Sequence, residues 1–231
     1  MLSVGKLAAG GEAYYLDTVA RGAEEYYTGA GEAPGEWLGA GSDALGFAGV
    51  VEPELLSRVL AGESPDGMRL ASSSRRVPGF DLTFSAPKSV SVLWALEPTA
   101  AGELVAAHDT AVRAALGWLE REACFGAQGA EVVPAGGFLA AGFRHRTSRA
   151  GDPQLHTHVV VANLGQGPDG RWTALDARHV FRQARTAGYL YQAQLRHELT
   201  RRLGVAWGEV EHGAADLAAV DPHLLLSLIH I

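Results

Sequence analysis

The run from Leu155 to Ala162 is rich in β-branched residues and carries two histidines, two positions apart. β-branched residues are enriched in strands, so this run predicts a β-strand. Alternate side chains of a strand share a face, so His156 and His158 lie on one face and Thr157 lies on the other. A fold that contains this strand therefore holds two imidazoles side by side on one surface of a sheet.

A third histidine precedes this strand. Residues 151–153, Gly-Asp-Pro, have turn chemistry, which can fold the segment that carries His145 back beside the strand. Three converging imidazoles form a geometry that suits zinc, manganese, nickel and similar divalent ions. Three protein ligands would leave positions open for a substrate, as in catalytic sites. Taken alone, a histidine on a strand is usually a hydrogen-bonded structural residue, and this alternative stays open at the level of spacing.

The composition is that of a globular protein. The chain has 231 residues, of which 47% are apolar, and this length allows one large domain or two small ones. Cys124 is the only cysteine, so no disulfide can form within the chain and a reducing compartment fits. The N-terminus lacks the apolar segment of a secretory signal, and no run of 18 apolar residues is present. We therefore predict a cytoplasmic protein without membrane insertion.

The net charge of −7 hides an uneven distribution. Residues 1–68 carry three Lys and Arg against eleven Asp and Glu, whereas residues 140–202 carry ten against four. The basic excess thus coincides with the histidine cluster. A local basic face is what phosphate contacts need, whatever the global sum. Arginines on a helix can also be merely solvated, which remains the alternative for those after residue 176.

Residue patterns predict a mixture of strands and helices. Phe80, Leu82 and Phe84 alternate with polar residues, which predicts a half-buried strand with Asp81 on its polar face. We expect Asp81 either to be a solvated or structural residue, or to orient a histidine or accept a tyrosine proton. The other expected strands are 2–7, 45–51, 171–175 and two within 131–145. One helix is expected to begin at residue 12, and others are expected at 53–60, 88–96, 99–123 and 176–203. Loops are expected at 28–43 and 62–78.

Two tyrosine pairs, Tyr14-Tyr15 and Tyr26-Tyr27, stand in the first expected helix. A tyrosine hydroxyl is a weak nucleophile at its ordinary pKa near 10, so a metal or a base has to activate it. The alternative is that these pairs are packing residues with one polar edge.

With these features in place, the chain resembles the relaxase domain of conjugative relaxases of the MobF (TrwC/TraI) type, which belong to the HUH endonuclease superfamily. The resemblance runs from the first residues to about residue 210. It is most specific in residues 80–91, FDLTFSAPKSVS, and in residues 152–158, DPQLHTH, and the tyrosine pairs add weight. It implies an α+β fold, in which a central antiparallel β-sheet is flanked by helices and the tyrosine helix lies over the metal.

The resemblance also implies roles for individual residues. His145, His156 and His158 would hold a divalent cation (Mg, Mn or Zn). Tyr14 would be the first nucleophile and Tyr26 the second, with Tyr15 and Tyr27 supporting or replacing them. Asp81 would assist proton removal or orient a metal ligand. Six cations are expected to contact DNA: Lys88, Arg75, Arg76, Arg144, Arg146 and Arg149.

The implied activity is site- and strand-specific DNA nicking and rejoining through a 5′-phosphotyrosine link, which initiates conjugative transfer from a plasmid or integrative element. The partners would be single-stranded and hairpin DNA at a transfer origin, with accessory relaxosome and coupling proteins. No phosphate-loop motif is present, so no nucleotide cofactor is expected. The spacing between the tyrosine pairs exceeds that of the best-known members by about one helical turn.

Residues 1–210 are expected to form the relaxase domain, cut short at its C-terminus, with residues 211–231 as a tail that has the look of a truncation and no helicase domain following. Three other functions stay open. One is a replication initiator or transposase nuclease of the same superfamily. The others are a metal-dependent hydrolase that uses water and an inactive DNA-binding remnant.

Overall fold

The computed structural model describes residues 1–8, 34–70, 77–128, 131–148 and 151–221, together with residues 223 and 225. Its centre is a five-stranded sheet in the order β1-β3-β7-β6-β2, in which every neighbouring pair is antiparallel. The strands are β1 (Leu2–Lys6), β2 (Glu36–Leu38), β3 (Gly79–Ser85), β6 (Ala140–Thr147) and β7 (Pro153–Ala162). The predicted α+β class with a central antiparallel sheet is therefore confirmed.

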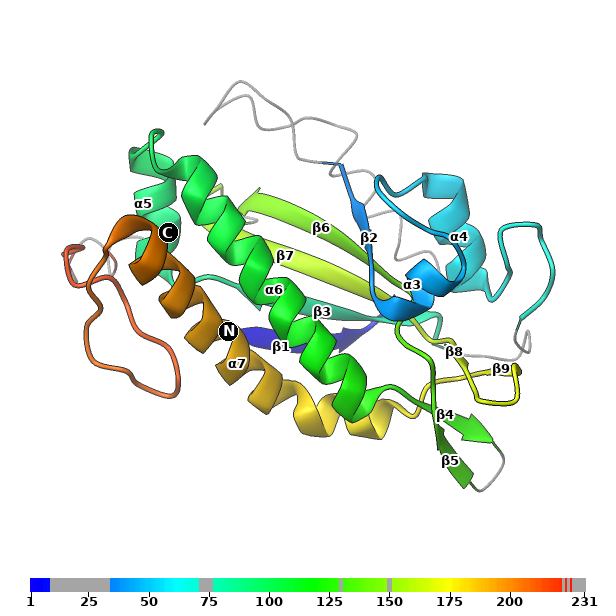
Figure 1. Cartoon of the computed structure of the whole chain (residues 1–231). Helices are drawn as coiled ribbons and strands as arrows, with labels where there is room; N and C mark the ends of the chain where they lie inside the picture. The colour runs from blue at the N-terminus through cyan, green and yellow to red at the C-terminus, as the bar shows by residue number, and fades with distance from the viewer. Residues whose placement is uncertain are drawn as a thin grey trace.

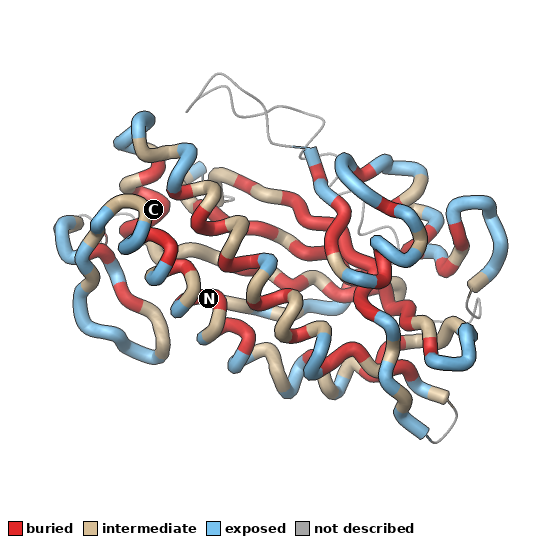
Figure 2. Tube along the Cα trace, in the orientation of Figure 1, coloured by how far each residue is buried: buried red, intermediate tan, exposed pale blue. Residues whose placement is uncertain are grey.

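Two long helices cover one face of this sheet. Helices α6 (Ala101–Ala123) and α7 (Ala177–Leu203) lie side by side across it. Helix α5 (Lys88–Leu96) lies near the beginning of α6 and the end of α7 (Figure 1). Phe80, Leu82 and Phe84 of β3 point into the core beneath these helices, as their alternation predicted. The buried residues follow the strands and the inward sides of α6 and α7 (Figure 2).

A smaller core covers part of the opposite face. It contains Trp37 and Phe47, residues from α4 (Pro53–Ala61), and the alternate residues of β6 and β7 such as Phe143 and Val160. The short helix α3 (Ala40–Ala44) follows β2 beside this core. The face that His156 and His158 share is this second face, because even-numbered residues of β7 point to it. Along this face of β7, the two histidines therefore come first, and Val160 and Ala162, which pack in the smaller core, follow them.

Two small strand pairs and the C-terminal segment complete the described chain. Strands β4 (Phe125–Gln128) and β5 (Glu131–Pro134) form a ribbon that projects from the sheet (Figure 1), and β8 (Gly165–Gln166) pairs with β9 (Trp172–Thr173). The C-terminal segment returns to α5, where Asp216 Oδ1 accepts hydrogen bonds from the Ser89 hydroxyl at 2.6 Å and the Ser89 amide at 3.2 Å. These two bonds satisfy donors in the first turn of α5, which has no side-chain cap of its own.

Two predictions for residues 28–51 are wrong. The loop expected at 28–43 contains β2 and α3, because Trp37 and Leu38 are buried by pairing with β6. The strand expected at 45–51 is not formed. Gly46 and Gly49 adopt φ angles of 76° and 72°, which an extended strand does not accommodate.

Candidate metal centre

The antiparallel pairing of β6 with β7 brings the three histidines together. The hairpin of these strands sets His145 directly opposite His156, and Phe143 opposite His158. The ring centroids of the three histidines form a nearly equilateral triangle, with 5.2 Å between His145 and His156, 4.9 Å between His145 and His158, and 5.0 Å between His156 and His158. Their ligand atoms lie within 4.8 Å of one another. The convergence predicted from the spacing and the turn is therefore confirmed.

Hydrogen bonds define the tautomers of two of these rings. His156 Nδ1 lies 2.8 Å from the Gln154 carbonyl oxygen, and His158 Nδ1 lies 2.9 Å and 3.0 Å from the two carboxylate oxygens of Asp81. A carbonyl and a carboxylate can only accept, so Nδ1 carries the proton in both rings and Nε2 carries the lone pair. Acceptors of this kind hold metal-ligating histidines in most metal sites and raise their basicity.

These residues fit a divalent ion. His145 and His156 are buried, and His158 is half-buried, so the triad lies at the boundary between the protein interior and the surface. A tetrahedral ion with about 2.1 Å to each nitrogen needs nitrogens about 3.4 Å apart, which small side-chain rotations reach from the observed triangle. Three imidazoles leave at least one coordination position for a substrate oxygen.

Asp81 lies where it can orient a metal ligand. The register of β3 against β7 sets Thr83 opposite His158 and Asp81 two residues further along the same face. Both Asp81 oxygens approach His158, and the Thr83 hydroxyl donates to Asp81 Oδ1 at 3.2 Å while lying 3.1 Å from His158 Nδ1. Sequence reasoning missed Thr83, although its alternation with Asp81 on the strand was a signal for a shared face.

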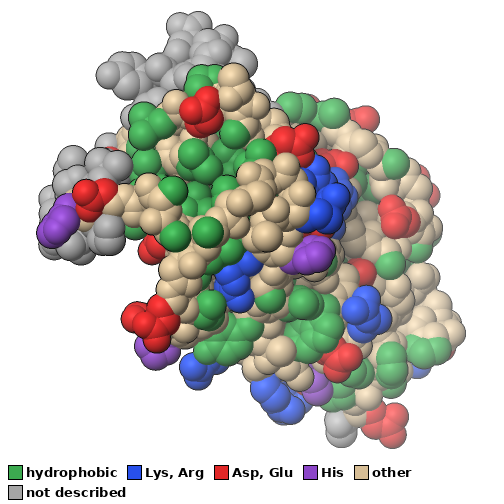
Figure 3. Space-filling view, turned by 60° about the vertical axis from the view of Figure 1, so that its left-hand side comes forward, with side chains coloured by type: hydrophobic (Ala, Val, Ile, Leu, Met, Phe, Trp, Pro, Cys, Tyr) green, Lys and Arg blue, Asp and Glu red, His purple; other side chains and the backbone are tan. Residues whose placement is uncertain are grey.

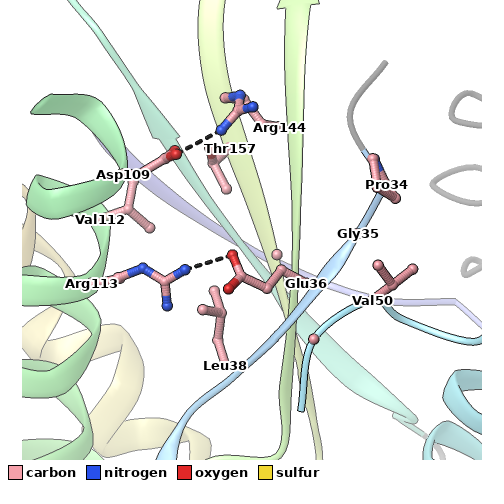
Figure 4. A pocket seen from close by; sticks show the side chains of 12 residues that line it. Pro34, Gly35, Glu36, Leu38, Val50, Asp109, Val112, Arg113, Arg144 and Thr157 are labelled. Carbon is pink, nitrogen blue, oxygen red and sulfur yellow. Dashed lines mark hydrogen bonds and ion pairs between the residues drawn. The ribbon is translucent and has the colours of Figure 1, made fainter. Parts of the chain in front are cut away.

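The cations expected to contact DNA are spread over several elements. Lys88 begins α5, directly after β3 ends beside His156. Arg144 points away from His145 into a cavity of about 330 Å³ between α6 and the β2–β6 edge (Figure 4). There its Nη1 pairs with Asp109 at 2.6 Å, and Arg113 pairs with Glu36 at 2.5 Å. Arg146 lies on β6; Arg75, Arg76 and Arg149 lie outside the described residues.

The four tyrosines Tyr14, Tyr15, Tyr26 and Tyr27 also lie outside the described residues.

On the face seen in Figure 3, Lys and Arg side chains are interspersed with acidic and apolar ones and form no single basic surface.

A second polar cluster lies on the face of β7 opposite to His156 and His158. His108 of α6 is fully buried, and its two ring nitrogens lie 2.8 Å from the Tyr191 hydroxyl and 2.8 Å from the Thr157 hydroxyl. Burial, together with the smaller effect of the positive charge on nearby Arg144, lowers the pKa of His108 to about 3, so this ring is neutral. Burial likewise raises the pKa of Tyr191 well above its ordinary value. Sequence reasoning missed this cluster, although His108 lies four residues after Leu104 on the apolar stripe of its helix.

In the part of the chain that the structure describes, none of the helices combines the length and the apolar character needed to cross a membrane.

Comparison with known proteins gives a consistent result. The protein-family model described as TrwC relaxase matches residues 8–227. Two curated relatives from Escherichia coli, one of them from strain K12, are both called multifunctional conjugation protein TraI and are 36% and 35% identical over 217 residues. These matches cover 86% of this chain but 12% of each relative, so the chain spans about an eighth of their length.

Solved structures match over nearly the whole chain. A conjugative relaxase TrwC in a copper-bound complex with oriT DNA is 36% identical with a TM-score of 0.85, and the match covers 99% of this chain and 80% of that one. TrwC complexed with a 27-mer DNA that comprises the recognition hairpin and the cleavage site is 35% identical with a TM-score of 0.83, and covers 99% and 78%. The predicted relaxase fold is thereby confirmed, and the chain belongs to the TrwC relaxase family.

Proposed function

We propose that this chain nicks and rejoins one DNA strand at a specific site of a transfer origin and so initiates conjugative transfer. The observation that carries the proposal is the triangle of His145, His156 and His158, backed by Asp81, in a member of the TrwC relaxase family. Related TrwC structures are described as complexes with oriT DNA, some of them metal-bound, which supports the same substrate here.

His145, His156 and His158 would hold a divalent cation, with Mg, Mn and Zn as the candidates. When bound, such a cation neutralises charge that builds on the scissile phosphate oxygens. Asp81 supports the ligand set through His158, since both of its oxygens face that ring. This contact favours ligand orientation over proton removal as the role of Asp81.

The proposed nucleophile is Tyr14, with Tyr26 as the second and Tyr15 and Tyr27 as supporting residues. The tyrosine oxygen attacks the phosphorus, the bond from phosphorus to the 3′ oxygen breaks, and a 5′-phosphotyrosine forms. The tyrosine proton is balanced by the proton that the departing 3′ oxygen acquires. Because the ester retains the bond energy, the reverse step reseals the strand without a nucleotide cofactor.

DNA binding would combine phosphate contacts with stacking of unpaired bases. The proposed phosphate contacts are Lys88, Arg75, Arg76, Arg144, Arg146 and Arg149. Among these, Lys88 has the most direct structural support, since α5 begins next to the end of β3 that carries Ser85 opposite His156. Hairpin and single-stranded DNA are the proposed substrates, and accessory relaxosome and coupling proteins the proposed partners.

The test uses single-stranded oligonucleotides that tile the noncoding DNA next to the gene, with Mg²⁺ or Mn²⁺, followed by a denaturing protein gel. We expect a covalent protein–DNA adduct that Tyr14→Phe abolishes. Tyr189→Phe, at a partly exposed tyrosine of α7, is the matched control and should retain the adduct. Nicked DNA without an adduct would instead favour a hydrolase that uses water. Binding without cleavage would favour an inactive remnant, and an adduct only at a replication origin or transposon end would favour the other nucleases of the superfamily.

A further inference from the structure

His108, Tyr191 and Thr157 form a hydrogen-bonded unit that crosses the main core. His108 comes from α6, Tyr191 from α7 and Thr157 from β7, so the unit ties both long helices to the central strand. His108 and Tyr191 have no exposed surface, and Thr157 is 6% exposed. The core beside them is largely apolar, and the Phe84 ring lies 5.5 Å from the Tyr191 ring, centroid to centroid, in a tilted arrangement. A leucine could fill such a core without any desolvation penalty, so the polar group needs a reason.

The position of Thr157 suggests that reason. It lies between His156 and His158 on β7, with its side chain on the opposite face. The other residues of β7 on the face of Thr157 are Pro153, Leu155, Val159 and Val161, none of which has a hydrogen-bonding side chain. Thr157 is thus the only residue on this face of β7 that can bond to His108.

The rest of β7 specifies its register weakly. Residues 159–162 are apolar and buried on both faces of the sheet, so a shifted strand would present nearly the same surface to both cores. A shift by two residues would set Leu155 or Val159 against His108 and leave buried polar atoms without partners, which is costly. The same shift would move His156 and His158 by about 7 Å relative to His145 and Asp81, which would disperse the ligand set.

We propose that His108, held by Tyr191, is a positioning residue that sets the register of β7 through Thr157 and thereby aligns His156 and His158 with His145. The Thr157 side chain lies on the face of β7 opposite to His156 and His158, so the unit acts on the histidines through the strand. This inference rests on the metal site proposed above. The neutral state of His108 is consistent with it, since the ring contributes hydrogen bonds and no charge.

The test separates register from stability. In the triple variant His108→Leu/Thr157→Val/Tyr191→Phe all three polar groups are removed together, so no buried atom loses its partner and stability should be largely preserved. We expect this variant to bind Mn²⁺ or Zn²⁺ at least tenfold more weakly in calorimetric titration, and to change the visible spectrum of bound Co²⁺, which reports ligand geometry. Phe84→Leu is the matched control. It perturbs the same core but keeps every hydrogen bond, so it should lower the melting temperature and leave metal affinity unchanged.

A second measurement does not depend on the metal. The Nδ1 proton of His158, bonded to Asp81, should give a protected imidazole signal in NMR spectra of the metal-free protein, and the triple variant should lose or broaden it. Wild-type affinity, Co²⁺ spectrum and imidazole signal in the triple variant would overturn the positioning role. If the wild-type chain bound no metal, the proposed function would fail, while the imidazole signal would still decide the inference about register.

Discussion

His158 and His108 lie on opposite sides of the same strand, and their ring nitrogens are used differently. In His158, Nδ1 is hydrogen-bonded to Asp81, which leaves Nε2 as the possible metal ligand beside the other two histidines. In His108, two protein hydroxyls engage both nitrogens inside the core. The first arrangement prepares an imidazole for a cation, and the second uses an imidazole as a connector.

The comparison shows that the chemistry of a histidine follows from what the fold gives each nitrogen. Burial alone does not separate the metal-face histidines from His108, because His145 and His156 are buried as well. What separates the two faces is an acceptor-only partner at Nδ1 on one face and hydroxyls, which can donate or accept, on the other. We call the side of β7 that carries His156 and His158 the metal face, and the side that carries Thr157 the helix face. The predictions below test the two faces one at a time.

The largest effect is expected on the metal face. In His156→Ala/His158→Ala, DNA cleavage should fall by roughly a thousandfold or more, since the charge stabilisation that a cation provides is worth several kcal/mol. DNA binding should be largely retained, because phosphate contacts are spread over other residues. Adduct formation and fluorescence anisotropy measure the two properties. His197→Ala, at an exposed histidine of α7, is the control; unchanged cleavage in the double variant would contradict the metal site.

The helix face should determine part of the pH dependence of stability. The pKa of His108 is about 3 in the folded chain and 6.5 ordinarily, so below pH 6.5 the unfolded chain takes up a proton that the folded chain does not. Stability from this group is therefore complete above pH 6.5 and is lost at about 1.4 kcal/mol per pH unit as the pH falls toward 3.

His108→Leu should lack this component. Urea unfolding of the metal-free wild type and variant between pH 6.5 and 4.5 should show the wild type losing about 2 kcal/mol more than the variant. Wild type and variant share every other titratable side chain, so the difference between the two curves isolates His108. Parallel stability curves would mean that His108 is not held neutral by burial.

A smaller effect is expected at the carboxylate of the metal face. Asp81→Asn keeps an acceptor oxygen but removes the charge that favours the Nδ1 proton of His158, so metal affinity should fall ten- to a hundredfold. Asp109→Asn makes the same change on the helix face, where the carboxylate pairs with Arg144. Titration with Zn²⁺ or Mn²⁺ should show the second variant within about twofold of wild type. Equal losses in both variants would indicate a general charge effect instead of an oriented ligand.

Much of the fold was accessible from the sequence because periodicity is a local signal. The alternation in Phe80–Phe84 and the β-branched run after Leu155 predicted the two strands that carry Asp81 and the histidines. The long helices α6 and α7 were predicted as 99–123 and 176–203, the first of them from its amphipathic pattern. Strands β2 and β4 were missed because three or four residues carry no period, and the partner of β2, strand β6, is distant in the chain.

The candidate site was predictable to the same extent. His145, His156 and His158 follow from strand alternation and one turn, both of which are local. The contact of Asp81 with His158 needs the register of β3 against β7, and the contact of His108 with Thr157 needs the docking of α6 on the sheet. Neither relation is written in the spacing of residues, because each depends on packing between elements far apart in sequence.

The smallest expected effect concerns Thr83, which completes the hydrogen bonds of Asp81. Thr83→Val removes a hydroxyl that donates to Asp81 Oδ1 and leaves the bond between Asp81 and His158 in place. A single hydrogen bond of this kind contributes about 1 kcal/mol, so metal affinity should fall less than about fivefold. Thr157→Val removes a hydroxyl at the neighbouring position across the sheet and tests the opposite face with the same substitution.

The two threonines should couple to different partners. In a double-mutant cycle, Thr83→Val should add little to the loss caused by Asp81→Asn, because the hydroxyl acts through that carboxylate. Thr157→Val should add its full effect to Asp81→Asn, since it acts through His108. Titration of metal into the wild type, the three single variants and the two double variants gives both coupling energies. If Thr83 and Thr157 behaved alike in these cycles, the two faces of β7 would be contributing to one undivided network, and the distinction between a face that prepares ligands and a face that sets register would have to be abandoned.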